Sequence, residues 1–312
     1  MDTEKFLQYV QAENKVEPKD MMPEDYRKLL VRQISQHAHS EVVGMLPEAN
    51  WITRAPSLRR KMALLAKIQD EAGHGLYLYA ATETLNNGEI AADRDSTYND
   101  MLSGKAKYSS IFNYPALSWA DIGAIGWLVD GAAIMNQVML MGNSYGPYSR
   151  AMLRICKEES FHQRQGYEIL MTLCRGTKEQ KQLAQDALDR FWWPALMMFG
   201  PNDDTSPNSQ KSMNYRVKRE SNDSLRQRFV DVTVPQAEFL GLKVPDKNLK
   251  WNEETGHYDF GDLPWDEFME ILKGNGPCNK KRLETKRKAQ AENAWVKEAA
   301  IAYGSKVKEL TK

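Results

Sequence analysis

Glu-x-x-His occurs twice in the sequence, each time inside a stretch with helical periodicity. The first copy is Glu71-Ala-Gly-His74 and the second is Glu159-Ser-Phe-His162. Residues three apart lie on one face of an α-helix, so each copy can direct a carboxylate and an imidazole to the same point. A single copy is weak evidence for a metal site, because a solvated glutamate beside a partly buried histidine has the same pattern. Two copies are stronger evidence.

A carboxylate precedes each copy at nearly the same distance. Glu41 lies 30 residues before Glu71, and Asp130 lies 29 residues before Glu159. The chain therefore repeats a carboxylate-bearing helix followed by a Glu-x-x-His helix, which is how some four-helix bundles hold two metal ions in their core. The predicted metal ligands are Glu41, Glu71, His74, Asp130, Glu159 and His162.

Asp130 gives this prediction its physical basis. It lies within the apolar segment 122–135, where its carboxylate is expected to be buried. Burying an ion costs several kcal/mol unless it is paired or bound to a metal. Two divalent cations would balance the four carboxylates of the predicted set. A core salt bridge or a protonated acid is the alternative interpretation of Asp130.

Neither the identity of the metal nor the roles of the residues around the ligands follow from the sequence pattern. Oxygen and nitrogen donors without thiolate suit iron or manganese, and spacing does not choose between the two metals. His37 lies four residues before Glu41, so it either contacts the site or is an ordinary core histidine. Asp70, Glu158 and Gln163 either orient the imidazoles or have a solvated or structural role.

The periodicity predicts an all-α, ferritin-like four-helix bundle with additional helices. Capping boxes are expected at Ser118 and at Thr177, and Pro147 is expected in a first helical turn. Gly73 and Gly75 flank His74, and each glycine within a helix costs about 1 kcal/mol relative to alanine, so we expect a neighbouring helix or a ligand to approach closely there. The predicted helices cover residues 23–47, 57–86, 119–142, 147–174 and 177–199.

We predict a single domain, residues 1–312, with the bundle core at about 23–199 and a C-terminal extension at about 200–312. Residues 200–211 form a Pro/Asn/Asp/Ser loop, and a helical segment then runs to about 242. Residues 244–263 are expected to be loop with a small hairpin. From about 279 a basic helical tail either presents a solvated face or touches an acidic partner or phosphate.

Charge and cysteine content exclude several classes of protein. Lys+Arg and Asp+Glu are both 42, which argues against a nucleic-acid binder. The three cysteines form no C-x-x-C pair, so a thiolate zinc or iron–sulfur site is not expected, and their sparse number suits the cytoplasm. No Gly-x-Gly-x-x-Gly fingerprint is present, so electrons for redox chemistry would come from another protein.

No membrane segment is expected. The N-terminus lacks the basic and apolar regions of a signal peptide. The most apolar stretch, 119–142, carries Asp121, Asp130, Asn136 and Gln137, which a lipid-facing span would not hold centrally. We interpret it as a buried helix.

Longer segments carry a family resemblance. They are Ser40–Pro47, Asn50–Pro56, Gln69–Tyr79, Lys107–Tyr114, Cys156–His162 and Phe191–Asp204. In these segments the chain resembles the catalytic A subunits of the ring-1,2-phenylacetyl-CoA epoxidases. The resemblance covers nearly the whole chain and is weakest at the two ends and in residues 86–101.

The resemblance implies a multicomponent monooxygenase with two Fe ions in this chain. One atom of O₂ would enter the 1,2 bond of the phenyl ring of phenylacetyl-CoA, and the other would leave as water. The implied partners are a structural C subunit of related fold, a small B subunit, and a reductase carrying NADPH, flavin and an iron–sulfur cluster. The implied assembly is a cytoplasmic hetero-oligomer.

The resemblance also implies contacts with the CoA thioester. Lysines would meet the phosphates and serine hydroxyls would donate hydrogen bonds, although sequence alone would place the lysines at the surface. The implied substrate-binding residues are Arg32, Gln36, Lys107, Tyr108, Ser109, Ser110, Met197, Ser206 and Lys218.

Other functions remain open to test. A benzoyl-CoA epoxidase-like enzyme would differ in substrate. A radical-generating ribonucleotide reductase subunit would need a tyrosine near the metals, for which Tyr77, Tyr79 and Tyr167 are candidates. Iron storage would require a cage with many irons per chain. A non-catalytic scaffold would be expected to lack one of the six ligands, and all six are present.

Overall fold

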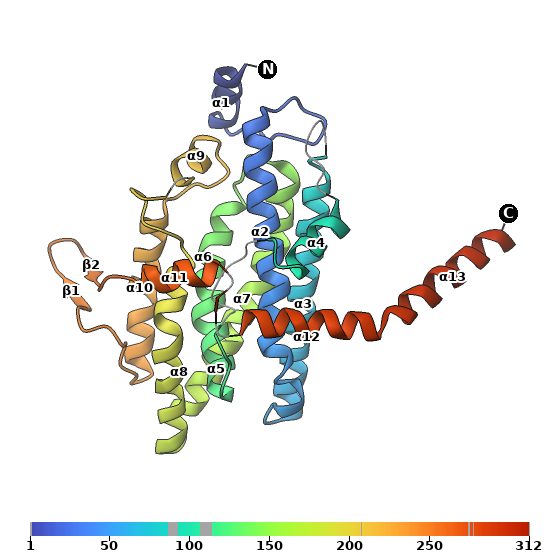
Figure 1. Cartoon of the computed structure of the whole chain (residues 1–312). Coiled ribbons are helices and arrows are strands. Elements are labelled where there is room, and N and C mark those ends of the chain that lie inside the picture. Colours follow the sequence, from blue (N-terminus) through green and yellow to red (C-terminus); the bar gives the residue numbers. More distant parts are fainter. Residues whose placement is uncertain are drawn as a thin grey trace.

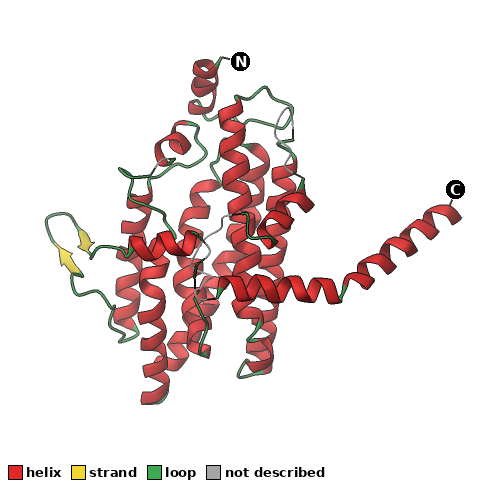
Figure 2. Cartoon of the chain, in the orientation of Figure 1, coloured by secondary structure: helices red, strands yellow, loops and turns green. Residues whose placement is uncertain are grey.

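Long helices lie side by side and form the body of the protein (Figure 1). The computed structural model describes residues 2–86, 93–106, 114–206, 208–273, 275–276 and 278–311. Within these residues the regular secondary structure consists of helices, one small hairpin and an isolated β-bridge between Val16 and Tyr145 (Figure 2). The bundle consists of α2 (Glu24–Ala49), α3 (Leu58–Glu83), the run α5–η3–α6, and α7 (Gly146–Cys174). The predicted all-α architecture is confirmed.

Local signals place the helix starts where the sequence predicts them. The Ser57 side chain caps α3. Capping boxes join Ser118 to Asp121 before α5 (Trp119–Ala124), and Thr177 to Gln180 before α8 (Lys178–Met197). The first helix is longer than expected, because α2 passes through Pro47 and ends at Ala49.

The expected single helix over 119–142 is interrupted. After α5 the backbone forms a π-helical turn, η3 (Ile125–Val129), and α6 (Asp130–Leu140) then begins at the candidate ligand itself. A π-turn widens the helix by one residue per turn, so it changes the direction of the side chains that follow. The turn lies against α7 at Gly166, where an added Cβ would be 2.4 Å from the backbone nitrogen of Trp127.

The two glycines beside His74 differ in what they permit. A Cβ at Gly75 would lie 2.7 Å from Cγ2 of Val42, so this glycine allows α2 and α3 to pack closely. At Gly73 the nearest atom belongs to Tyr77, 4.0 Å away. Among the described residues no neighbouring helix approaches Gly73, so close helix packing is found at Gly75 and not at Gly73.

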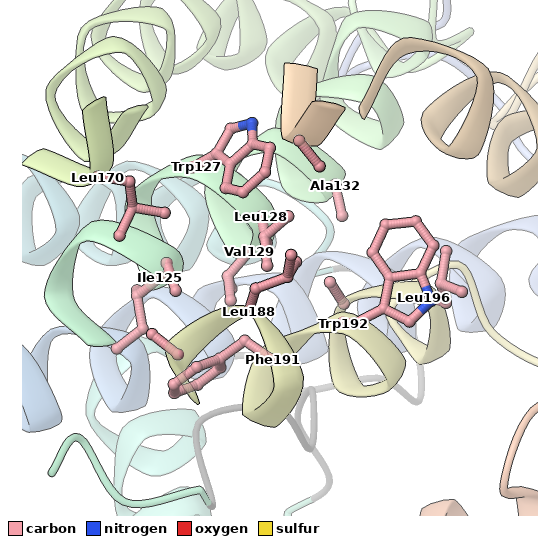
Figure 3. Packing of buried hydrophobic residues seen from close by; sticks show 14 of the residues in the cluster. Ile125, Trp127, Leu128, Val129, Ala132, Leu170, Leu188, Phe191, Trp192 and Leu196 are labelled. Carbon is pink, nitrogen blue, oxygen red and sulfur yellow. The ribbon is translucent and has the colours of Figure 1, made fainter. Parts of the chain in front are cut away.

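The apolar run at the centre of the chain is a core helix. By length and composition Trp119–Leu140 is the one helix in the described ranges that would fit a membrane span, but 67% of that window is buried within the protein. Its side chains pack against those of α8 (Figure 3). Contributing residues shown there include Trp127, Leu128, Val129, Leu188, Phe191, Trp192 and Leu196.

Shorter elements surround the bundle. Along the chain, α1 (Thr3–Gln11) precedes α2, η1 (Ile52–Arg54) lies between α2 and α3, and α4 (Arg94–Leu102) lies between α3 and α5. After the bundle come α9 (Ser209–Asn214), α10 (Asn222–Phe239) and α11 (Trp265–Leu272). The expected hairpin is formed by β1 (Lys250–Asn252) and β2 (His257–Asp259), which pair antiparallel with Trp251 opposite Tyr258. Helix α10 packs on α6, which brings the extension next to the candidate site.

The basic tail forms two helices. The first, α12 (Asn279–Glu292), lies against the bundle, with Leu283 buried and the Gln290 amide donating to the Tyr98 hydroxyl at 2.7 Å. The second, α13 (Ala294–Leu310), projects away from the body (Figure 1) and buries none of its residues.

Candidate metal centre

The six predicted ligands meet in the centre of the bundle, and all six are buried. They form two groups that share Glu71 and Glu159, and the ligand atoms within each group lie within 4.8 Å of one another. One group is Glu41, Glu71, His74 and Glu159; the other is Glu71, Asp130, Glu159 and His162. The arrangement offers two adjacent cation positions bridged by two carboxylates.

Both imidazoles direct Nδ1 toward carboxylate oxygens. Nδ1 of His74 is 3.4 Å from Glu159 and 3.5 Å from Glu41. Nδ1 of His162 is 3.4 Å from Glu71 and 3.5 Å from Glu159. Although both atoms are buried, neither has a hydrogen-bond partner among the described residues. A buried nitrogen without a partner needs an explanation, and a bound cation supplies one, so these residues fit a metal centre.

The outer nitrogen of each imidazole is held by a carboxylate from the opposite helix. Nε2 of His74 on α3 is 2.8 Å from Glu158 on α7. Nε2 of His162 on α7 is 3.2 Å from Asp70 on α3. A carboxylate at Nε2 favours the tautomer with its proton there and leaves Nδ1 free to bind a cation. Of the two roles left open for Asp70 and Glu158, the structure favours orientation of the imidazoles.

Glu41 is held by two side chains. Its Oε1 lies 2.7 Å from Nε2 of His37 and 3.3 Å from the Gln137 amide nitrogen. Nδ1 of His37 lies 2.8 Å from the hydroxyl of Tyr148. His37 therefore contacts the candidate site, and it links a predicted ligand to a tyrosine.

Asp130 is paired with a lysine that sequence reasoning missed. The Lys67 ammonium lies 2.6 Å from Oδ2 of Asp130, as an ion pair without hydrogen-bond geometry, and 2.8 Å from Glu48. All three residues are buried. Lys67 lies four residues before Glu71 and so on its face, which was the only signal in the sequence. The core salt bridge considered as an alternative for Asp130 is thus present, within the ligand cluster.

The pKa values of two of the four carboxyls are raised, whereas hydrogen bonds from histidines lower those of Glu41 and Glu159. Burial raises the pKa of Asp130 to about 7; Lys67 opposes this shift and Glu159 reinforces it. Burial and the charge of Glu159 also raise the pKa of Glu71 well above its usual range. Burial lowers the pKa of Lys67, but Asp130 and Glu48 outweigh it and the ammonium stays charged. Bound cations would favour the charged forms of these carboxyls.

A cavity of about 380 Å³ leads from the ligand cluster to the C-terminal extension. At one end it is lined by Glu41, Glu71, Asp130 and Glu159. Five of the substrate-binding residues implied by the resemblance also line it: Arg32, Gln36, Met197, Ser206 and Lys218. The other four, Lys107, Tyr108, Ser109 and Ser110, lie outside the described residues.

Lys218, which lines the cavity on the side of the C-terminal extension, has a largely buried ammonium group. Its ammonium donates to the Asn222 side chain at the start of α10. Burial lowers the pKa of Lys218 to about 8, although the charge of Asp203 opposes the shift. An ammonium that lacks full solvation gains more from a bound anion than an exposed one does.

Comparisons with known proteins agree with this architecture. The family model described as phenylacetic acid catabolic protein matches residues 1–295. The chain is 64% identical over 303 residues to the A subunit of the 1,2-phenylacetyl-CoA epoxidase of Escherichia coli (strain K12), covering 97% of this chain and 96% of that protein.

Proposed function

The chain belongs to the phenylacetic acid catabolic protein family, and on this basis we propose that it is the catalytic subunit of an epoxidase acting on phenylacetyl-CoA. The product would be the ring-1,2-epoxide of the thioester. The single observation that carries the proposal is the cavity, because it joins the six-ligand cluster to a cation suited to a phosphate.

We propose two Fe ions in the cluster, which the six predicted ligands would hold; Glu71 and Glu159 are common to both ligand groups. When bound, such a centre supplies the activation of O₂ and the transfer of one oxygen atom. The side chains of this chain fix the ligand geometry. Asp70 and Glu158 hold the imidazoles, while His37 and Gln137 hold Glu41.

The cavity would position the substrate. Apolar and aromatic side chains, including Val129, Met197 and Phe199, line it and suit a phenyl ring. Lys218 at the other end suits a phosphate of CoA, and Ser206 can donate a hydrogen bond. Anchoring the CoA portion would hold the ring beside the oxidising centre, where fixed geometry supplies much of the rate.

Partner proteins are part of the proposal. The curated relative is named as one component of a larger enzyme, and we infer that this chain also works in a multisubunit complex. Its proposed companions are a ferritin-like C subunit, a small B subunit, and an NADPH-dependent reductase with flavin and iron–sulfur cofactors. We place the complex in the cytoplasm as a hetero-oligomer.

The test is reconstitution. The chain is combined with its companion subunits, reductase, NADPH, O₂ and phenylacetyl-CoA, and the thioester product is identified by mass spectrometry. Glu71→Ala and His162→Ala are expected to abolish the product while retaining helicity by circular dichroism. Glu179→Ala, at an exposed carboxylate on α8, is the matched control. Full activity in either ligand variant would refute the assignment, and epoxidation of benzoyl-CoA alone would point to the related enzyme.

A further inference from the structure

The two halves of the proposed dinuclear centre have the same types of ligand. They share Glu71 and Glu159. The remaining ligands are Glu41 and His74 in the first half and Asp130 and His162 in the second. Each half therefore offers one terminal carboxylate and one imidazole. The groups that contact the two terminal carboxylates, by contrast, differ in charge.

Among the described residues, no lysine or arginine contacts the terminal carboxylate of the first half. The closest contact is Nε2 of His37, 2.7 Å from Glu41, followed by the Gln137 amide at 3.3 Å. On its other side, Nδ1 of His37 lies 2.8 Å from the Tyr148 hydroxyl, so this contact adds no lysine or arginine. Glu41 therefore keeps its negative charge for a bound cation.

A positive charge contacts the terminal carboxylate of the second half. The ammonium of Lys67 is 2.6 Å from Asp130, and Glu48 lies on the other side of that ammonium at 2.8 Å. Lys67 is 5% exposed and Glu48 is 2% exposed, so solvent ions screen these charges little. Glu48 is outside both ligand groups, so within the second half the contact of Lys67 falls on Asp130 alone.

We propose that the two halves load in order, the first half binding a divalent cation more tightly because Lys67 already compensates Asp130 in the second. This inference rests on the proposed dinuclear centre. A protein holding about one cation per chain would carry it between Glu41 and His74. The second cation would also be the first to leave under chelation.

The experiment is an anaerobic titration of the metal-free full chain, purified with its companion subunit. Co(II) is the probe, followed by its visible absorption and by calorimetry. Two steps of one equivalent each are expected, with affinities at least about tenfold apart because unit charges at this distance interact strongly in a buried site. Asp130→Asn is expected to remove the second step and keep the first.

Two variants should move the second step in opposite directions. Lys67→Met removes the competing charge and is expected to bring the second affinity to within about threefold of the first, since one nearby unit charge accounts for most of the difference. Glu48→Gln leaves Lys67 with Asp130 as its sole ion-pair partner among the described residues. It is expected to increase the difference between the first and the second metal affinity. Lys61→Met, on the same helix but outside the cluster, is the charge-matched control.

The outcomes separate the inference from the proposed function. If the chain takes up no metal, both fail. If two equivalents bind with indistinguishable affinities, or if the gap is the same in Lys67→Met, Glu48→Gln and wild type, only the loading order is refuted. Should Lys67→Met fold poorly, as judged by thermal melting, the widened gap in Glu48→Gln still decides the question.

Discussion

Glu158 on α7 holds the imidazole of His74 on α3, with 2.8 Å between its carboxylate and Nε2. The reciprocal pair is Asp70 on α3 with His162 on α7. In both segments the acidic residue directly precedes the Glu of Glu-x-x-His, but it serves the histidine of the other segment. The repeated unit is therefore five residues long, and its parts act together only when α3 and α7 pack.

Removing this orienting carboxylate should weaken metal binding. Glu158→Gln keeps the shape of the side chain but loses the charge that holds the Nε2 proton of His74. Loss of such a partner typically costs about 10- to 100-fold in metal affinity. Competition with a coloured chelator measures the change. Glu168→Gln, at a half-buried carboxylate on the same helix that pairs with Arg60, is the control, and equal affinity in both variants would contradict the assigned role.

The affinity for the CoA portion should fall as pH rises through about 8. Burial lowers the pKa of Lys218 to about 8 in the free protein, so the ammonium is mostly charged at pH 7 and mostly neutral at pH 9. A phosphate binds the charged form, so the dissociation constant of CoA should rise about tenfold over that range. Calorimetry at several pH values measures it.

Two variants test whether Lys218 is the titrating group. In Lys218→Arg the side chain stays charged over the whole range, so affinity should be nearly independent of pH. In Lys218→Met binding should be weak at every pH. A wild-type pH dependence that persists in Lys218→Met would assign the titration to another group.

Much of the site follows from sequence spacing, whereas its charge balance does not. The intervals Glu41–Glu71 and Asp130–Glu159 placed four carboxylates on four helical segments, and the structure brings them together. Lys67 also lay on the face of Glu71, but a lysine within a helix ordinarily indicates a solvated face. Its pairing with Asp130 depends on how α3 meets α6, and no local pattern encodes that.

The same limit applies to the backbone. Capping signals such as Ser118 and Thr177 act within a few residues, so they predicted the helix starts. The π-turn before Asp130 has no such signal, because it accompanies the close contact between Gly126 and Gly166 on different helices. Tertiary contacts thus decide the direction in which Asp130 points.

Removing metal should lower thermal stability. Without cations the cluster buries Glu41, Glu71, Asp130 and Glu159 with incomplete compensation, and burial raises the pKa of Glu71 and Asp130. A cation present at 100 times its dissociation constant stabilises the folded state by about 2.7 kcal/mol. Chelation should then lower Tm by about 5 °C in a protein of this size. An equal Tm with and without chelator, measured by calorimetry, would argue against metal binding in this cluster.

The contact between α7 and the π-turn should tolerate no side chain. A Cβ at Gly166 would lie 2.4 Å from the Trp127 nitrogen and 2.5 Å from Gly126 atoms, all of them backbone that cannot rotate away. Gly166→Ala should therefore destabilise the fold by about 1–3 kcal/mol, as overpacking does. Because η3 ends directly before Asp130, the second metal step should also weaken.

Gly304→Ala is the control, since Gly304 lies in the exposed helix α13 with no atom within 4 Å of an added Cβ. It should leave the denaturant midpoint unchanged and raise helicity slightly, because alanine favours helix by about 1 kcal/mol over glycine. A midpoint in Gly166→Ala equal to that of Gly304→Ala would show that the two helices can separate without cost.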